Sequence, residues 1–445
     1  MSKYLIWPII LISFYQCSFL ITKASRTGIF FPLEVEEKLS VEGAVNKDLK
    51  RENNRIYLST KKGYLYCLDV PKKEFSWEHH INQKIISSPY LGQEHVYFFT
   101  EDELYSLDKK TGVLRWKVEL KDKITTPVVE NKGKVYFGTL SRNIWVLEAA
   151  SGKILNKHQI DGPVYSGLAF WENSLIFGTI RGELCFLRKN GKLSIRFKAQ
   201  QAIKSDLLVD DSLLYFGSND DYFYCFNLKR KKIKWKVKTG ADVISSPITD
   251  KKRIYFISLN NVLYCLNKKN GTILWWNIIP ARSYYQLNLV GDKIIVTSLS
   301  DELLAFEIKE GKEKGKFKAP TEIKSNSIWI TPNILVTIYD VYKKKGRLLF
   351  LKRKIAVKLK ANKSSPQKIG EKITFTAAAF GLFEPQFEFY LAPKDKPLER
   401  IQEFSKNNSW DWYPEEKEDY IIKVIAKDNE HQVEDTISFS IVEEE

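Results

Sequence analysis

Apolar and polar residues alternate along most of the chain in short runs that recur at a nearly constant interval. Each run is rich in β-branched and aromatic side chains, as in Lys134–Thr139 and Arg253–Ser258. The third residue of each run falls at positions 57, 97, 136, 176, 215, 255, 295 and 335, so every step is 39 or 40 residues. This period, with no helical pattern between the runs, predicts eight copies of one all-β unit.

Each unit carries the signals of four short strands. A polar turn follows the run and leads into a second strand, such as Tyr64–Asp69. In several units a glycine turn comes next, as Thr111-Gly112 does in the second unit. A third strand often contains tryptophan, at Trp77, Trp116, Trp235 and Trp275, and a Ser-Pro or Thr-Pro pair opens a short strand into the next unit. Four-stranded sheets in series predict an eight-bladed β-propeller over residues 27–354.

The two ends of the repeat region predict how the ring closes. The last unit has no Trp-type strand of its own, and Leu33–Leu39 is a spare strand placed before the first unit. We expect this strand to complete the last sheet and to cover its open edge. Seven blades is the alternative, because the last unit carries an insertion at residues 339–346.

One position in the repeat predicts where most of the cysteines lie. The residue ten before the Trp position is small and apolar in most units, and the set is Cys67, Ser106, Val146, Phe186, Cys225, Cys265 and Ala305. Asn156, Arg196 and Gly315 stand at the Trp position in units three, four and seven. We expect the three cysteines of this slot to be buried as free thiols rather than paired or metal-bound, because equivalent positions on separate sheets are too far apart for a disulfide.

Composition adds a charge asymmetry. Of the 445 residues, 44% are hydrophobic and 28% charged, which are ordinary globular values, and the net charge is +16. Residues 355–445 contain 12 basic and 18 acidic residues, so the first 354 residues hold 58 basic and 36 acidic ones. The basic surface of the repeat region predicts acidic partners.

The N-terminus has the pattern of an export signal. Lys3 precedes an uncharged run from Tyr4 to Thr22. Three outcomes are open for residues 1–26. The segment can be lipidated at Cys17, which follows Phe14-Tyr15-Gln16, or cleaved after Ala24. It can also be retained as a membrane anchor, since 19 residues can span a hydrocarbon core of ~30 Å. All three predict an extracytoplasmic, periplasmic or outer-membrane-associated bacterial protein, and lipidation or retention would also give it a membrane tether at the N-terminus.

The segments Ser106–Trp116 and Cys265–Trp275 resemble the repeat of pyrroloquinoline-quinone-type propellers, in which a small residue, an Asp, a Gly turn and a Trp recur. The resemblance covers residues 33–351 and implies that the Trp packs between neighbouring blades. One branch of this family holds quinone dehydrogenases, which need an adjacent Cys–Cys pair and long loops that this sequence lacks. The other branch holds non-enzymatic envelope scaffolds, similar to the propeller lipoprotein of the outer-membrane barrel-assembly machine.

That second branch sets the functional expectation. It predicts a protein-binding propeller that acts in envelope or outer-membrane protein assembly, with no catalytic, cofactor-binding or metal-binding residues. A quinone-dependent dehydrogenase-like propeller and an extracytoplasmic ligand-sensing module are the alternatives.

Residues 355–445 leave the 40-residue period but still alternate, as in Lys372–Ala377 and Tyr420–Ala426, with Pro and Gly turns between the runs. About seven short strands predict a β-sandwich. Phe387–Tyr390 and Asp419–Asp428 resemble the triple-tyrosine, immunoglobulin-like domain of bacterial sensor and envelope proteins. The resemblance implies an accessory or interaction module.

Two segments are candidates for partner contact. Arg282-Ser-Tyr-Tyr285 replaces the Ser-Pro pair of its unit, and exposed aromatic rings beside Arg are typical of interaction hot spots. A substitution that serves packing is the alternative for this segment. The candidate contacts are Arg282, Tyr284, Tyr285 and Arg181. Lys229–Lys238 alternates lysines with apolar residues, which predicts an outer strand with a solvated basic face. We expect it to meet anionic lipid or an acidic envelope protein rather than nucleic acid.

Overall fold

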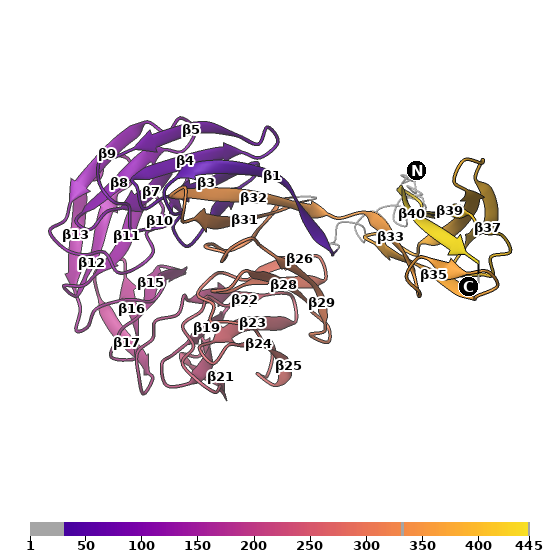
Figure 1. Cartoon of the computed structure of the whole chain (residues 1–445). Helices are drawn as coiled ribbons and strands as arrows, with labels where there is room; N and C mark the ends of the chain where they lie inside the picture. The colour runs from indigo at the N-terminus through magenta and orange to yellow at the C-terminus, as the bar shows by residue number, and fades with distance from the viewer. Residues whose placement is uncertain (1–30, 331–332, 444–445) are drawn as a thin grey trace, which may run out of the picture. The chain divides into compact units, whose positions relative to one another are not determined.

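Short β-strands, almost all paired antiparallel, are the regular elements of the described chain (Figure 1). The computed structural model describes residues 31–330 and 333–443. Eight sheets of four strands follow one another along the sequence, as the 40-residue period predicts, and two further sheets lie C-terminal to them. The described residues contain no helix, and therefore none that could span a membrane.

The first four sheets, each written from the innermost to the outermost strand, contain the following strands. They are β2 (Lys50–Glu52), β3 (Arg55–Ser59), β4 (Tyr64–Asp69) and β5 (Glu74–His80); β6 (Tyr90–Leu91), β7 (His95–Phe99), β8 (Glu103–Asp108) and β9 (Leu114–Glu119); β10 (Val129–Asn131), β11 (Lys134–Thr139), β12 (Asn143–Glu148) and β13 (Ile154–Gln159); and β14 (Ala169–Trp171), β15 (Ser174–Gly178), β16 (Glu183–Arg188) and β17 (Leu193–Lys198).

The other four sheets repeat this order. They are β18 (Leu208–Asp210), β19 (Leu213–Gly217), β20 (Tyr222–Asn227) and β21 (Lys232–Lys238); β22 (Ile248–Thr249), β23 (Arg253–Ser258), β24 (Val262–Asn267) and β25 (Ile273–Ile278); β26 (Asn288–Val290), β27 (Lys293–Thr297), β28 (Glu302–Glu307) and β29 (Glu313–Lys318); and β30 (Ile328–Ile330), β31 (Asn333–Asp340), β32 (Lys345–Arg353) and β1 (Leu33–Glu42). The sheets are numbered one to eight, from the sheet of β2–β5 to the sheet that contains β1.

Sheet eight joins the two ends of the repeat region. The N-terminal strand β1 lies beside β32, as the spare strand at Leu33–Leu39 predicts (Figure 1). Sheets one and eight also contact each other directly, since the Leu49 backbone N–H donates to Oδ1 of Asn326 at 2.8 Å. Apolar side chains of both sheets form one buried cluster. The first and last units of the series are therefore neighbours in space.

The small slot of the repeat is buried in all seven units where the sequence identifies it. Cys67, Cys225 and Cys265 are fully buried. Each is paired with a buried tyrosine of the adjacent strand nearer the innermost one, which is β3, β19 or β23. All three are free thiols, as predicted. Burial raises the pKa of Cys67 to about 11, so the thiol stays protonated and unreactive near neutral pH.

Tryptophans of the outermost strands pack across to the next sheet. The Trp116 indole N–H donates to the Ala149 carbonyl at 2.8 Å, and the ring lies against Gly152 of the following hairpin. A Cβ on Gly152 would come within 2.7 Å of that ring, and its φ is +70°. The same pairing recurs four times, in Trp77–Gly112, Trp116–Gly152, Trp235–Gly271 and Trp275–Gly311.

Sheet four departs from the register that the sequence predicts. Counting ten residues from Phe186 places Arg196 at the Trp position, but the structure pairs Phe186 with Ser194. The hairpin between β16 and β17 is shorter, and the bulge of the outer strand moves to between Leu184 and Cys185. Arg196 is therefore the extra residue of a bulge and not the counterpart of Trp116.

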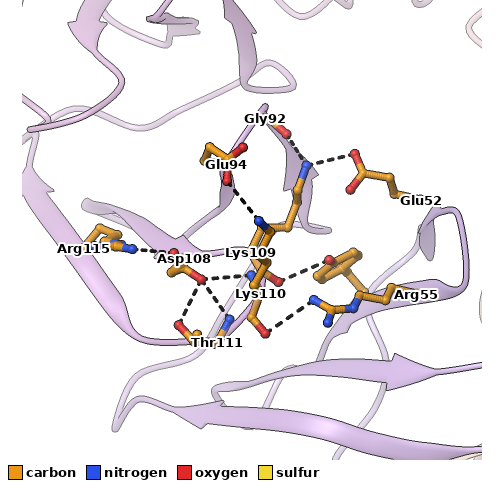
Figure 2. Close-up of polar contacts among 10 residues, drawn as sticks. Glu52, Arg55, Gly92, Glu94, Asp108, Lys109, Lys110, Thr111 and Arg115 are labelled. Atoms are coloured by element: carbon orange, nitrogen blue, oxygen red, sulfur yellow. Dashed lines mark hydrogen bonds and ion pairs between the residues drawn. The ribbon is translucent and has the colours of Figure 1, made fainter. Parts of the chain in front are cut away.

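A buried lysine ties sheet two to sheet one (Figure 2). The Lys109 side chain is 9% exposed, and its Nζ lies 2.8 Å from Glu52 Oε1 and 2.7 Å from the Gly92 carbonyl. Asp108 caps the same hairpin by accepting hydrogen bonds from the backbone N–H groups of Lys110 and Thr111. Lys268 of sheet six makes the corresponding ion pair with Asp210 of sheet five.

The C-terminal unit contains the remaining sheets. A three-stranded sheet is formed by β33 (Ala356–Ala361), β35 (Ile373–Phe380) and β38 (Ser409–Trp412), and a five-stranded sheet by β34 (Gln367–Lys368), β40 (Gln432–Val442), β39 (Asp419–Lys427), β36 (Gln386–Pro393) and β37 (Glu399–Ser405). Side chains of both sheets, including Phe375, Trp412 and Tyr420, enclose one apolar core. The chain divides by contacts into a unit at residues 35–351 and this second unit, which also includes residues 31–34.

Candidate functional site

One end of the eight sheets carries two kinds of loop, and we call it the connection face. The turn between the second and third strands of each sheet lies there, together with the connection from one sheet to the innermost strand of the next. The Leu299 N–H donates to the Arg282 carbonyl at 2.8 Å, and the Ile180 N–H donates to the Pro163 carbonyl at 3.1 Å. The corresponding bond joins turn and preceding connection in sheets one, three, five and six as well.

Hydroxyl groups hold six of the eight connections in place. Ser87 Oγ accepts a hydrogen bond from the Phe99 N–H at 2.9 Å, twelve residues further on. The same bond, at the same separation, is made by Thr126, Ser166, Ser205, Ser245 and Ser325. The Ser-Pro and Thr-Pro pairs point to three of these connections, whereas Ser166, Ser205 and Ser325 were missed. A search for Ser or Thr at steps of 39 or 40 residues finds all of them except Ser325, which lies two such steps beyond Ser245.

The innermost strands of sheets one to three and the connections that lead into sheets one to six line an open cavity of about 730 Å³. Its wall includes the basic side chains Lys50, Arg51 and Lys204 and the carboxylates Asp48 and Asp206. Ser246 Oγ donates to Asp206, while Oδ1 of Asp48 is buried without a hydrogen-bond partner among the described residues. The cavity is thus polar and of mixed charge.

Near the cavity, Glu130 fixes a buried phenol. The Tyr97 hydroxyl donates to Glu130 Oε2 at 2.7 Å. Burial first, and this hydrogen bond second, raise the pKa of Tyr97 far above its ordinary value. The phenol is therefore a fixed hydrogen-bond donor. No three His, Cys, Asp or Glu side chains of residues 31–330 and 333–443 gather where they could hold a metal ion.

Exposed apolar side chains recur on the connection face. Leu140, Ile180 and Leu299 occupy the same position of three turns and are 46%, 41% and 41% exposed. Ile86 and Tyr165, from two connections, are also exposed and line the cavity. Val341 and Tyr342, in the turn of sheet eight, extend the set. Repeated apolar exposure on one face is typical of a protein-binding surface.

The predicted contact residues lie on this face but do not all point outward. Arg282 and Arg181 are exposed, in the connection before sheet seven and in the turn of sheet four, and Tyr284 is half-buried. Tyr285 is buried, and its hydroxyl donates to the Ile323 carbonyl at 3.2 Å. The ring at Tyr285 is therefore not an exposed contact, and its burial agrees with the alternative of a packing substitution. Cys17 lies outside the described residues.

Comparison with known proteins identifies the repeat. The family model described as outer membrane protein assembly factor BamB matches residues 38–237 and 181–332, which is more than half of the chain. The chain belongs to this family. A curated relative, the outer membrane protein assembly factor BamB of Legionella pneumophila (strain Paris), is 28% identical over 123 residues. That match spans 27% of this chain and about a third (31%) of the relative.

Solved structures share the fold. The crystal structure of BamB from Moraxella catarrhalis matches with a TM-score of 0.61 at 15% identity, over 73% of this chain and 98% of that one. A quinohemoprotein alcohol dehydrogenase from Comamonas testosteroni matches with a TM-score of 0.58 at 10% identity, over 72% of this chain and 76% of that one. At these identities the likeness concerns the β-propeller fold, which serves both an assembly factor and an enzyme.

Proposed function

We propose that the protein is a non-enzymatic scaffold of the bacterial cell envelope that binds another envelope protein and assists outer-membrane protein assembly. The match to the BamB family over residues 38–332 supports this role. In this proposal the eight four-stranded sheets are the blades of one closed propeller, and the C-terminal unit is an immunoglobulin-like β-sandwich that acts as an accessory module.

The observation that carries the proposal is the apolar set on the connection face. Leu140, Ile180 and Leu299 each stand next to the backbone bond that holds turn and connection together, so their positions are fixed. A rigid array of apolar side chains can be buried by a partner with little loss of conformational entropy. Arg181 and Arg282 lie on the same face and are the contacts proposed for acidic groups of that partner.

The N-terminal segment completes the proposal. An export signal at residues 1–26, with lipidation at Cys17 as one of its three fates, would place the propeller outside the cytoplasm and tether it to a membrane. The protein would then meet its partner at the membrane surface, where the partner can cover the exposed apolar side chains.

Co-purification from crosslinked envelope membranes tests this function. The full chain should retain envelope proteins, and the double variant Leu140→Asp/Leu299→Asp should retain about tenfold less, because two carboxylates would be desolvated at the contact. Val113→Asp is the matched control, since Val113 is 60% exposed but lies in the opposite hairpin, between β8 and β9. Equal recovery by all three chains, or recovery of no envelope protein by the unaltered chain, overturns the proposal.

A further inference from the structure

At four junctions between neighbouring sheets a tryptophan of the outermost strand covers a glycine of the next hairpin, as Trp235 covers Gly271. Between sheets three and four only the tryptophan is missing: Asn156 stands at its position, and His158 is the side chain nearest to Gly191. Between sheets four and five the tryptophan is absent, because Ser194 stands opposite Phe186. The glycine is absent as well: Lys231, with a φ of 54°, occupies the corresponding left-handed position. Both halves of the pair are replaced together.

The unfilled position leaves a groove of about 820 Å³ between sheets four and five. Its floor is apolar and includes the buried side chains of Phe186 and Leu228. Five basic residues line it, namely Arg188, Lys189, Arg196, Lys229 and Lys231, against one acidic residue, Glu172. The groove lies at the outer hairpins and is distinct from the connection face.

These basic side chains have lost the carboxylates that serve the same positions elsewhere. Lys189 stands at the hairpin position of Lys109 and Lys268. Each of those two lysines pairs with the last residue of the innermost strand of the preceding sheet, which is Glu52 or Asp210. For Lys189 the corresponding last residue is the uncharged Asn131. Arg188 stands where Asp108 caps its own hairpin in sheet two. None of the five makes an ion pair within the described ranges, whereas lysines of the equivalent hairpin of sheet seven do.

We infer that this groove is a binding site for a ligand carrying two or more phosphate groups. Uncompensated cations that line one groove repel one another, and a multivalent anion relieves that repulsion. The guanidinium groups of Arg188 and Arg196 can each hold a phosphate through two parallel hydrogen bonds, and the lysines add mobile point charges. The apolar floor lowers the local dielectric and strengthens these contacts.

The site does not depend on the proposed scaffold role. It occupies another face, and it uses residues that the connection face does not. The phosphate groups can belong to a lipid headgroup or to a soluble polyphosphate, and the experiment separates these two sources.

Calorimetric titration of the purified full chain with tripolyphosphate tests the inference. We expect binding that weakens as salt rises. Arg188→Ser/Lys231→Ser should weaken it about tenfold or more. Lys312→Ser/Lys314→Ser removes the same charge from the paired hairpin of sheet seven and should change it less than about twofold. Ser194→Trp keeps all five cations but fills the slot, and it should also abolish binding.

The outcomes are separable. Thermal melting confirms that each variant is folded. Competition by phosphatidylcholine vesicles containing cardiolipin, whose headgroup carries two phosphates, assigns the source to a headgroup, and a lack of competition assigns it to a soluble ligand, while both results support the groove. Three results overturn the inference. They are an equal weakening of binding by the two double variants, binding of a glutamate decapeptide but not of tripolyphosphate, and no binding by the unaltered chain.

Discussion

Single glycines determine how closely neighbouring sheets approach. Gly271 has a φ of +77°, and an added Cβ would lie 2.7 Å from the Trp235 ring. Gly133 has a similar φ of +69°, but nothing lies within 4 Å of its Cβ position. The two positions therefore separate backbone strain from steric conflict.

Replacing Gly271 with alanine should lower the free energy of unfolding by about 2–3 kcal/mol, because strain and overpacking add. Gly133→Ala should cost about 1 kcal/mol, which is the strain alone. Urea denaturation followed by tryptophan fluorescence measures both. Equal shifts of the unfolding midpoint would show that the Trp–Gly contact does not limit packing.

At this scale the sequence predicts burial better than it predicts exposure. The slot of Cys67, Cys225 and Cys265 could be found because a small residue recurs at a fixed distance from the Trp position. The burial of Tyr285 could not, because its partner, the Ile323 carbonyl, is 38 residues away and belongs to the next connection. A ring beside an arginine is a typical hot spot only if no neighbouring loop covers it.

At the scale of strands and sheets, the ion pair of Lys109 holds sheet two against sheet one. The lysine is buried, whereas the Glu52 side chain is 41% exposed, so water partly screens the pair. A second pair on the same hairpin, Lys110 with Glu94 at 4.0 Å, is exposed on both sides. One hairpin thus offers a buried cation and an exposed one for comparison.

Glu52→Gln should destabilise the protein by about 1–2 kcal/mol, since the buried ammonium of Lys109 keeps only the Gly92 carbonyl as a strong acceptor. Glu94→Gln should change stability by less than about 0.5 kcal/mol. Thermal unfolding at constant pH measures the difference. If the two variants melt together, the pair with Glu52 contributes no more than a surface ion pair.

Elements of the repeat were predictable where one rule serves every unit. The four strands of each sheet and the pairing of β1 with the last sheet follow from the pattern and from the need to cover an open edge. The shift in sheet four was not predictable, because a hairpin that is one residue shorter leaves the alternation of apolar residues intact. Only the position of the bulge changes, and with it the side that Arg196 faces.

At the scale of the whole molecule, repetition explains most of the composition. The aromatic residues recur because each junction between sheets needs the same packing, and the excess of positive charge lies in the repeat region rather than in residues 355–445. Both proposals rest on departures from this repetition: apolar residues at some turns of the connection face, and the junction between sheets four and five, where both the tryptophan and the glycine are replaced. The family could be recognised from the repeat, whereas the proposed binding surface required the exposure of each side chain.

The central claim is that the connection face contacts an envelope protein. Photo-crosslinking in living cells tests it most directly, with a benzoylphenylalanine placed at Leu299 on this face, and at Val113 and Trp276 as exposed controls on an outer hairpin and an outer strand. The account predicts a discrete crosslinked product from position 299 and none from positions 113 and 276. The proposed contact would be contradicted if position 299 gave no product, or if either control position gave a product in equal yield.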